Sequence, residues 1–157
     1  MPKFYLLTLG CQMNHNDSER IAGLLLALGM EAANRAEEAD VIILNTCSVR
    51  DSAEARVFGF VGYWVGLKKK KPNLIIAVTG CMPGRDQDKK IRKKLAGADL
   101  FFPIDELPLL PGWLKGLNQK DFGQFNEQQE SSYLKLSPQR ANNFQASITI
   151  QTGCNNF

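Results

Sequence analysis

Three short apolar segments of similar design recur along the chain, and each of them ends on a cysteine. They are YLLTLGC at 5–11, VIILNTC at 41–47 and LIIAVTGC at 74–81. Short runs rich in β-branched residues and bounded by polar residues or glycine predict buried strands. The cysteines lie 36 and 34 residues apart, close to the length of one strand–helix–strand unit. The pattern therefore places each cysteine at the same end of its own unit.

A polar stretch with apolar residues at helical spacing follows each of these predicted strands. We expect helices at about 17–28, 51–68, 87–96 and 107–117, a loop at 12–16, and short strands at about 30–35 and 99–102. The second helix contains Gly59, Gly62 and Gly66. Each glycine costs a helix about 1 kcal/mol relative to alanine, so we expect all three to pack closely against the sheet.

Strand–helix–strand units with right-handed crossovers build a parallel sheet. We therefore predict an α/β fold, an open and mainly parallel sheet of four to five strands with helices on both faces, of the Rossmann-like or flavodoxin-like kind. This domain is expected to cover 1–117, followed by a linker at 118–132 that is rich in Gln, Asn and Glu. The remaining residues, 133–157, contain two strand-like segments at 133–136 and 146–151.

Composition and charge add few constraints. The chain has 157 residues, 44% of them hydrophobic, and a net charge of +3, which permits a nucleic-acid partner without requiring one. No secretory signal or membrane span is visible, so we expect a cytoplasmic protein, in which four cysteines favour metal binding or catalysis over disulfides. The lysine run at 68–71 suits the carboxyl end of a helix, and such a cluster is also able to contact RNA phosphates.

Parallel strands bring their carboxyl ends to one edge of the sheet, so Cys11, Cys47 and Cys81 are expected to converge there. Soft thiolates from three segments suit zinc or an iron–sulfur cluster, and three protein ligands leave one metal position open for chemistry. Each cysteine precedes a predicted helix, whose N-terminus should lower the thiol pKa. Taken singly, each cysteine is more simply a core residue, but three at equivalent strand ends favour ligands.

Four segments in order carry these cysteines. They are Gly10-Cys11-Gln12-Met13-Asn14 with Asp17-Ser18-Glu19, then Asn45-Thr46-Cys47-Ser48-Val49-Arg50, then Gly80-Cys81, and finally Gly153-Cys154-Asn155-Asn156-Phe157. Together they resemble the radical-SAM methylthiotransferase family. The first two look most like the MiaB-type branch, which adds a methylthio group to isopentenyladenosine next to the anticodon of tRNA. The branches that act on threonylcarbamoyladenosine in tRNA or on a ribosomal protein are the alternatives.

This resemblance implies that Cys11, Cys47 and Cys81 hold an auxiliary 4Fe-4S cluster that donates sulfur. Cys154 matches the first cysteine of the family's C-x-x-x-C-x-x-C motif, which binds a second 4Fe-4S cluster and S-adenosyl-L-methionine. The sequence ends at Phe157, before the other two cysteines of that motif. We therefore expect the N-terminal part of a longer enzyme, cut at the start of its radical-SAM domain, with no complete catalytic site and no activity alone. Residues 146–151 would be the first strand of that domain.

The family's partners are implied in the same way. They are tRNA and an electron donor such as flavodoxin or ferredoxin, with no membrane, and we expect a monomer. Asn45 and Arg50 flank the central cysteine and are candidates for contacts to cluster sulfur or substrate. Their simpler roles are a turn-forming side chain and a residue of the first helical turn. His15, the only histidine, is expected to be a solvated loop residue and not a fourth ligand.

Two other classes of protein remain open on the residues alone. A structural zinc module would use the same cysteines but ordinarily needs four ligands, and Cys154 lies beyond the predicted linker. A dithiol redox protein usually carries closely spaced cysteines such as C-x-x-C, which this chain lacks.

Overall fold

A computed structural model of the chain describes residues 1–47, 51–117, 132–140, 146, 148 and 149, with the backbone alone described at 51–54. Its strands are β1 (Lys3–Leu9), β2 (Glu31–Ala32), β3 (Val41–Thr46), β4 (Ile75–Gly80) and β5 (Leu100–Phe101). Its α-helices are α1 (Gln12–Ala27), α2 (Asp51–Lys68), α3 (Cys81–Arg85), α4 (Lys90–Lys94) and α5 (Leu110–Leu117). Three 3-10 helices complete the elements, η1 (Ala36–Glu38), η2 (Ile104–Leu109) and η3 (Tyr133–Lys135).

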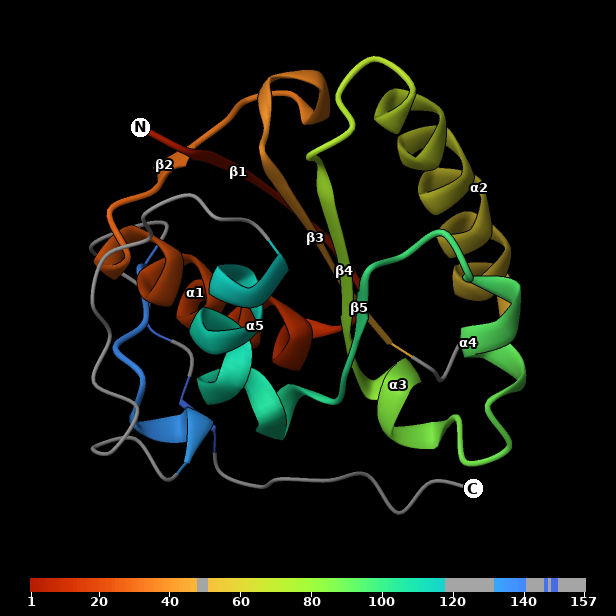
Figure 1. Cartoon of the computed structure of the whole chain (residues 1–157). Helices are drawn as coiled ribbons and strands as arrows, with labels where there is room; N and C mark the ends of the chain where they lie inside the picture. The colour runs from red at the N-terminus through yellow and green to blue at the C-terminus, as the bar shows by residue number, and fades with distance from the viewer. Residues whose placement is uncertain (48–50, 118–131, 141–145, 147, 150–157) are drawn as a thin grey trace.

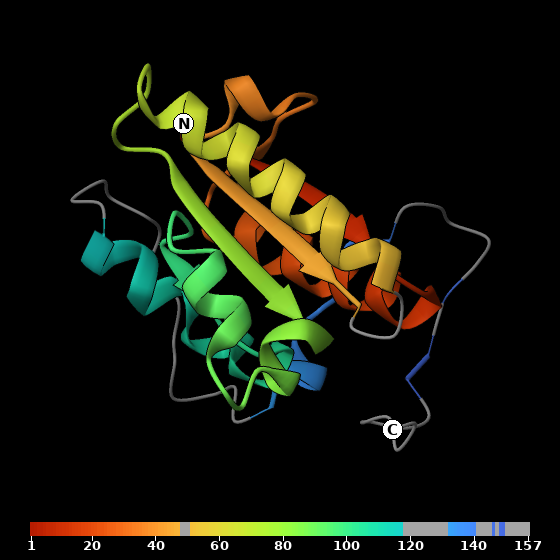
Figure 2. The same cartoon turned by 90° about the vertical axis from the view of Figure 1, so that its right-hand side faces the viewer.

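The strands form one sheet in the order β2-β1-β3-β4-β5, and every neighbouring pair is parallel. Every residue of β3 and β4 is buried, as expected for the central strands of a sheet that is covered on both faces. β3 and β4 lie side by side and point the same way in Figure 2. The predicted open, parallel α/β sheet is therefore confirmed.

Helices cover both faces of this sheet, with α1 and α5 on one side and α2 and α4 on the other (Figure 1). The alternation of side chains along a strand supplies both cores. In β3, Val41 and Ile43 join the core beneath α1 and α5, whereas Ile42 and Leu44 join the core beneath α2. The predicted stripe on α2 faces the sheet, and its largest member, Trp64, is 1% exposed.

The first helix begins earlier than the pattern predicts. It starts at Gln12, directly after β1, instead of near Asp17. The backbone amide of Cys11 donates a hydrogen bond to Oδ1 of Asn14 at 3.1 Å, and this contact turns the chain into the helix without an intervening loop. His15 is exposed as predicted, but it lies in the first turns of α1 and not in a loop.

The single helix predicted at 87–96 is wrong, because two short helices follow β4. α3 includes the Pro-Gly pair that the sequence predicts as a turn. Asp86 follows α3, and its carboxylate accepts hydrogen bonds from the backbone amides of Ile91 at 2.9 Å and Arg92 at 2.8 Å. This side chain caps α4 and separates it from α3.

The strand predicted at 133–136 is also wrong, because the segment forms η3. Tyr133 and Leu136 are buried in the core beneath α1 and α5, so tertiary packing overrides their local β propensity. Further along, the amide of Gln139 donates to the carbonyl oxygen of Glu19 at 2.7 Å. The predicted linker, apart from residue 132, lies outside the described residues.

The strand predicted at 146–151 is described only at 146, 148 and 149, and these three residues are not in a strand. Among the helices that the structure describes, none combines the length and the apolar character needed to span a bilayer.

The glycines of α2 do not pack against the sheet, so that prediction is wrong. A Cβ atom built at Gly59, Gly62 or Gly66 would meet no other atom within 4 Å, and all three residues are exposed. They lie on the solvent side of the helix, opposite the buried stripe. Their cost in helix stability is therefore not recovered by packing.

We expect Gly62→Ala to raise the free energy of unfolding by about 0.5–1 kcal/mol, because alanine fits an exposed helix interior better than glycine. Gly23→Ala in α1 is the matched comparison, since a Cβ atom there would collide with the carbonyl oxygen of Ser137. Urea denaturation followed by circular dichroism measures both variants. A stabilising Gly23→Ala or a destabilising Gly62→Ala would contradict this packing.

Candidate functional site

Three cysteines follow the carboxyl ends of three adjacent strands. Parallel pairing aligns the last residues of β1, β3 and β4 with one another. Cys47 and Cys81 come immediately after this aligned row, and Cys11 comes one residue later in its strand. Neighbouring strands in a sheet are about 4.8 Å apart. The backbone therefore brings all three cysteines to the same edge of the sheet.

The three thiols differ in exposure and share an electrostatic environment. Each is free, with Cys47 buried, Cys81 half-buried and Cys11 exposed. Burial raises the pKa of the Cys81 thiol to about 11, and the nearby Cys47 and Cys11 raise this pKa further, as does Asp17. The thiols are therefore close enough to oppose one another's ionisation.

The expectation that the helix N-terminus lowers the thiol pKa is wrong for Cys81. α3 does begin at Cys81, but this helix has only five residues. A hydrogen bond with the Asn14 side chain lowers the pKa, yet burial and the neighbouring acidic groups outweigh it. Desolvation of the thiolate therefore dominates at this end of β4.

A buried polar network joins the end of β3 to the start of α1. The side chain of Asn45, which is 0% exposed, donates from Nδ2 to the carbonyl oxygen of Asn14 at 2.8 Å and to Oγ of Ser18 at 2.9 Å. Its Oδ1 accepts from Nδ2 of Asn14 at 3.2 Å. The hydroxyls of Thr8 and Ser18 lie 2.7 Å apart. Since Asn14 also binds the amide of Cys11, the network connects Asn45 to the first cysteine.

Two glycines permit this close approach. Gly80 has φ +106°, a conformation that favours glycine, and a Cβ atom there would collide with the carbonyl oxygen of Thr46. A Cβ atom at Gly10 would overlap the side chain of Asn14. The Gly-Cys pairs of the sequence thus have a structural reason that the strand pattern did not supply. Asn14 and Ser18 were also missed, although their positions at the start of a helix after a strand are visible in the sequence.

A second buried group behind the cysteines was not predicted. Asp17 is 2% exposed, and its Oδ1 has no hydrogen-bond partner among the described residues. Burial raises the pKa of this carboxyl to about 6, and the positive charge of Arg20 opposes the shift. Arg20 donates to Oδ1 of Asn16 at 2.6 Å, and Nδ2 of Asn16 donates to Oγ1 of Thr149 at 2.7 Å.

The remaining candidates are not placed beside the three thiols. Arg50 and Cys154 lie outside the described residues. Within the described part of the chain, no set of three or more His, Cys, Asp or Glu side chains is arranged to hold a metal ion. A tetrahedral zinc site places each thiolate about 2.3 Å from a single ion. The three cysteines are thus neighbours on one edge, but their side chains do not form a closed site of this kind.

We expect Asn45→Ala to lower the free energy of unfolding by about 1–3 kcal/mol, because it leaves buried polar atoms of Asn14 and Ser18 without a partner. Thr8→Val tests a single hydroxyl contact of the same network and should cost less. Chemical denaturation measures both losses. An Asn45→Ala chain as stable as the parent would show that the network does not support the fold.

We expect the Asp17→Asn substitution to change the pH dependence of stability. The native pKa of about 6 lies above the ordinary value of 3.8, so the native state binds this proton more tightly than the unfolded chain does. Parental stability therefore falls as pH rises through that interval. Relative to the parent, Asp17→Asn should be about 1–2 kcal/mol more favourable at about pH 7.5 than at about pH 4. Urea denaturation at the two pH values measures this difference, and a pH-independent effect would contradict a buried carboxyl.

Comparison with known proteins connects this edge to a family. Residues 3–103 match the family model described as Uncharacterized protein family UPF0004. The chain is 42% identical to the tRNA-2-methylthio-N(6)-dimethylallyladenosine synthase of Clostridium botulinum (strain Hall), over 99% of this chain and 35% of the relative. The proteins of the same name from Dictyoglomus thermophilum and Bifidobacterium adolescentis are 42% and 41% identical, over 100% and 98% of this chain and 36% and 33% of theirs.

The chain thus spans about a third of the length of these curated relatives. The matched region contains Cys11, Cys47 and Cys81, together with all five strands. The predicted family resemblance is confirmed: the chain belongs to family UPF0004, the N-terminal domain of MiaB-family proteins.

Proposed function

We propose that this chain is the cluster-holding part of a tRNA methylthiotransferase, one that modifies the dimethylallyl (isopentenyl) adenosine next to the anticodon. The observation that carries the proposal is the alignment of three free thiols at the ends of three adjacent strands. Its chemistry is drawn from relatives about 42% identical that are named for this reaction.

Cys11, Cys47 and Cys81 suit a 4Fe-4S cluster in their chemistry. Their thiols oppose one another's ionisation, as the raised pKa of Cys81 indicates, and bound iron would relieve this repulsion. A cluster held by three cysteines supplies an iron with an open position, which is able to carry a sulfur species. Loading would remove the proton from Cys81, so the site should bind iron more readily as pH rises.

The surrounding side chains would position these ligands. Asn45 and Asn14 hold the start of α1 against the end of β3, and thereby hold Cys11 beside Cys47. Cys47 is buried, which would keep water from the inner side of the site, whereas the exposed Cys11 would leave the outer side open to substrate. Asn45 would act as a positioning residue, since both of its amide protons are already donated within the network.

The remaining assignments belong to the same proposal. Cys154 would be the first ligand of a second 4Fe-4S cluster that binds S-adenosyl-L-methionine, and Arg50 would contact the cluster or the substrate. Residues 1–117 would form the cluster domain, 118–132 a linker and 133–157 the start of a radical-SAM domain. The whole enzyme would act in the cytoplasm as a monomer, with tRNA as substrate and flavodoxin or ferredoxin as electron donor.

We expect this chain, reconstituted without oxygen, to bind about four iron and four sulfide per molecule. Replacing Cys11, Cys47 or Cys81 singly with alanine should lower the iron content severalfold, because two thiolates do not retain the cluster. Iron and sulfide analysis, with the visible absorption of the cluster, measures the loss.

Cys154→Ala is the matched control, because it removes a cysteine that the proposal assigns to a different cluster. It should leave the iron content of this chain unchanged. Stoichiometric zinc without iron would favour a structural zinc module instead. Loss of two thiols on mild oxidation without any metal would favour a dithiol redox protein.

A further inference from the structure

The positive charge of the chain is concentrated in the segment that follows β4. Residues 81–98 include six basic and two acidic side chains, a net charge of +4, whereas the whole chain carries +3. The rest of the molecule is therefore close to neutral. All six basic residues are exposed, and we call them the α4 basic surface: Arg85, Lys89, Lys90, Arg92, Lys93 and Lys94.

The neighbouring acidic groups neutralise little of this charge. The Asp86 carboxylate binds the backbone amides that start α4, and Asp88 pairs with Lys90 at 2.9 Å. Within the described part of the chain, Lys89, Arg92 and Lys93 make no ion pair. Their positive charges therefore face solvent without a partner from these residues.

The lysine run at 68–71 behaves differently. Lys68 pairs with Asp99 at 2.5 Å, and Lys71 pairs with Asp40 at 3.3 Å and donates to the carbonyl oxygen of Ala39 at 2.7 Å. These contacts hold the end of α2 near the beginning of β3, at the edge of the sheet opposite the cysteines. Lys69 and Lys70 are exposed there, which makes them a matched control for the α4 basic surface.

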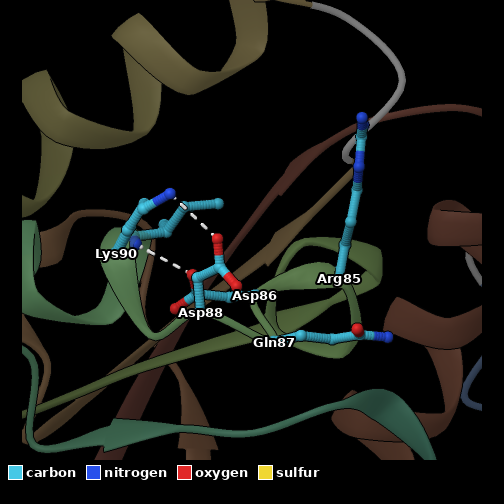
Figure 3. A pocket seen from close by; sticks show the side chains of 6 residues that line it. Arg85, Asp86, Gln87, Asp88 and Lys90 are labelled. Atoms are coloured by element: carbon cyan, nitrogen blue, oxygen red, sulfur yellow. Dashed lines mark hydrogen bonds and ion pairs between the residues drawn. The ribbon is translucent and has the colours of Figure 1, made fainter.

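The α4 basic surface lies on the cysteine side of the sheet. α3 begins at Cys81 and sits at the tip of β4, and α4 follows it closely along the chain (Figure 2). A hollow of about 380 Å³ lies between the two helices, with Arg85 and Lys90 on either side of Asp86 and Asp88 (Figure 3). Two carboxylates line this hollow, so it does not suit a single phosphate. The exposed cations around it better suit an extended polyanion.

We propose that the α4 basic surface binds the phosphate backbone of the RNA substrate and holds that RNA beside the cysteine edge. This inference rests on the proposed function for the identity of the RNA, and it assigns the contact to a particular surface of this chain. Backbone binding by exposed Lys and Arg needs charge but no apolar core. A protein partner ordinarily buries aromatic or apolar side chains. Among the described residues, no large exposed hydrophobic side chain lies within 81–98, which favours RNA over an acidic protein.

The test compares Arg92→Gln/Lys93→Gln with Lys69→Gln/Lys70→Gln, since each double variant lowers the net charge by the same amount. Fluorescence anisotropy with a labelled tRNA anticodon stem–loop gives the dissociation constant between about 50 and 200 mM salt. We expect the α4 variant to bind about tenfold more weakly, with a salt slope reduced by about 1.5–2. The α2 variant should stay within about twofold of the parent.

Equal weakening by the two variants would overturn the proposal, because it would show an effect of net charge alone. Parental affinity of the α4 variant, or no RNA binding by the parent at about 50 mM salt, would also overturn it. So would an α4 variant that keeps its RNA affinity but loses binding to an acidic protein such as flavodoxin. Both variants should retain the iron content of the parent. Failure of the cluster proposal would appear in the iron analysis of the cysteine variants, independently of RNA affinity.

Discussion

The rest of the structure depends on the parallel register of β1, β3 and β4. Backbone hydrogen bonds align the last residues of these three strands, and β3 lies between the other two. A slip of one residue in any strand would turn its core side chains to the opposite face. The apolar cores on both faces oppose such a slip, because β3 and β4 are buried along their whole length. The same packing that stabilises the sheet thus keeps the three cysteines at one edge.

The edge is held together by polar contacts that water does not reach. Asn45 is fully buried, yet its amide group makes three hydrogen bonds to Asn14 and Ser18. In this environment a hydrogen bond is strong and an unmatched polar atom is costly, so the network specifies one placement of α1 on the sheet. Gly10 and Gly80 leave the room that this placement needs.

Charge is arranged in two different ways on the two sides of this edge. Behind the thiols, burial raises the pKa values of Asp17 and Cys81, so both groups favour their neutral forms without a bound cation. In front, the cations of α4 remain exposed to solvent. A cationic cluster would relieve the first environment, and a polyanionic substrate would suit the second. The two environments would place a reactive sulfur next to an RNA strand.

The sequence alone determined the parallel sheet, the extent of α2 and the common edge for Cys11, Cys47 and Cys81, because these follow from local apolar runs and the handedness of crossovers. Only the tertiary structure decided the start of α1, the 3-10 conformation at Tyr133 and the raised pKa of Cys81. Each of these depends on contacts between residues far apart in the chain or on burial. Periodicity reports which side of an element is apolar, and it carries no information about which polar atoms meet across the fold or how much solvent they lose.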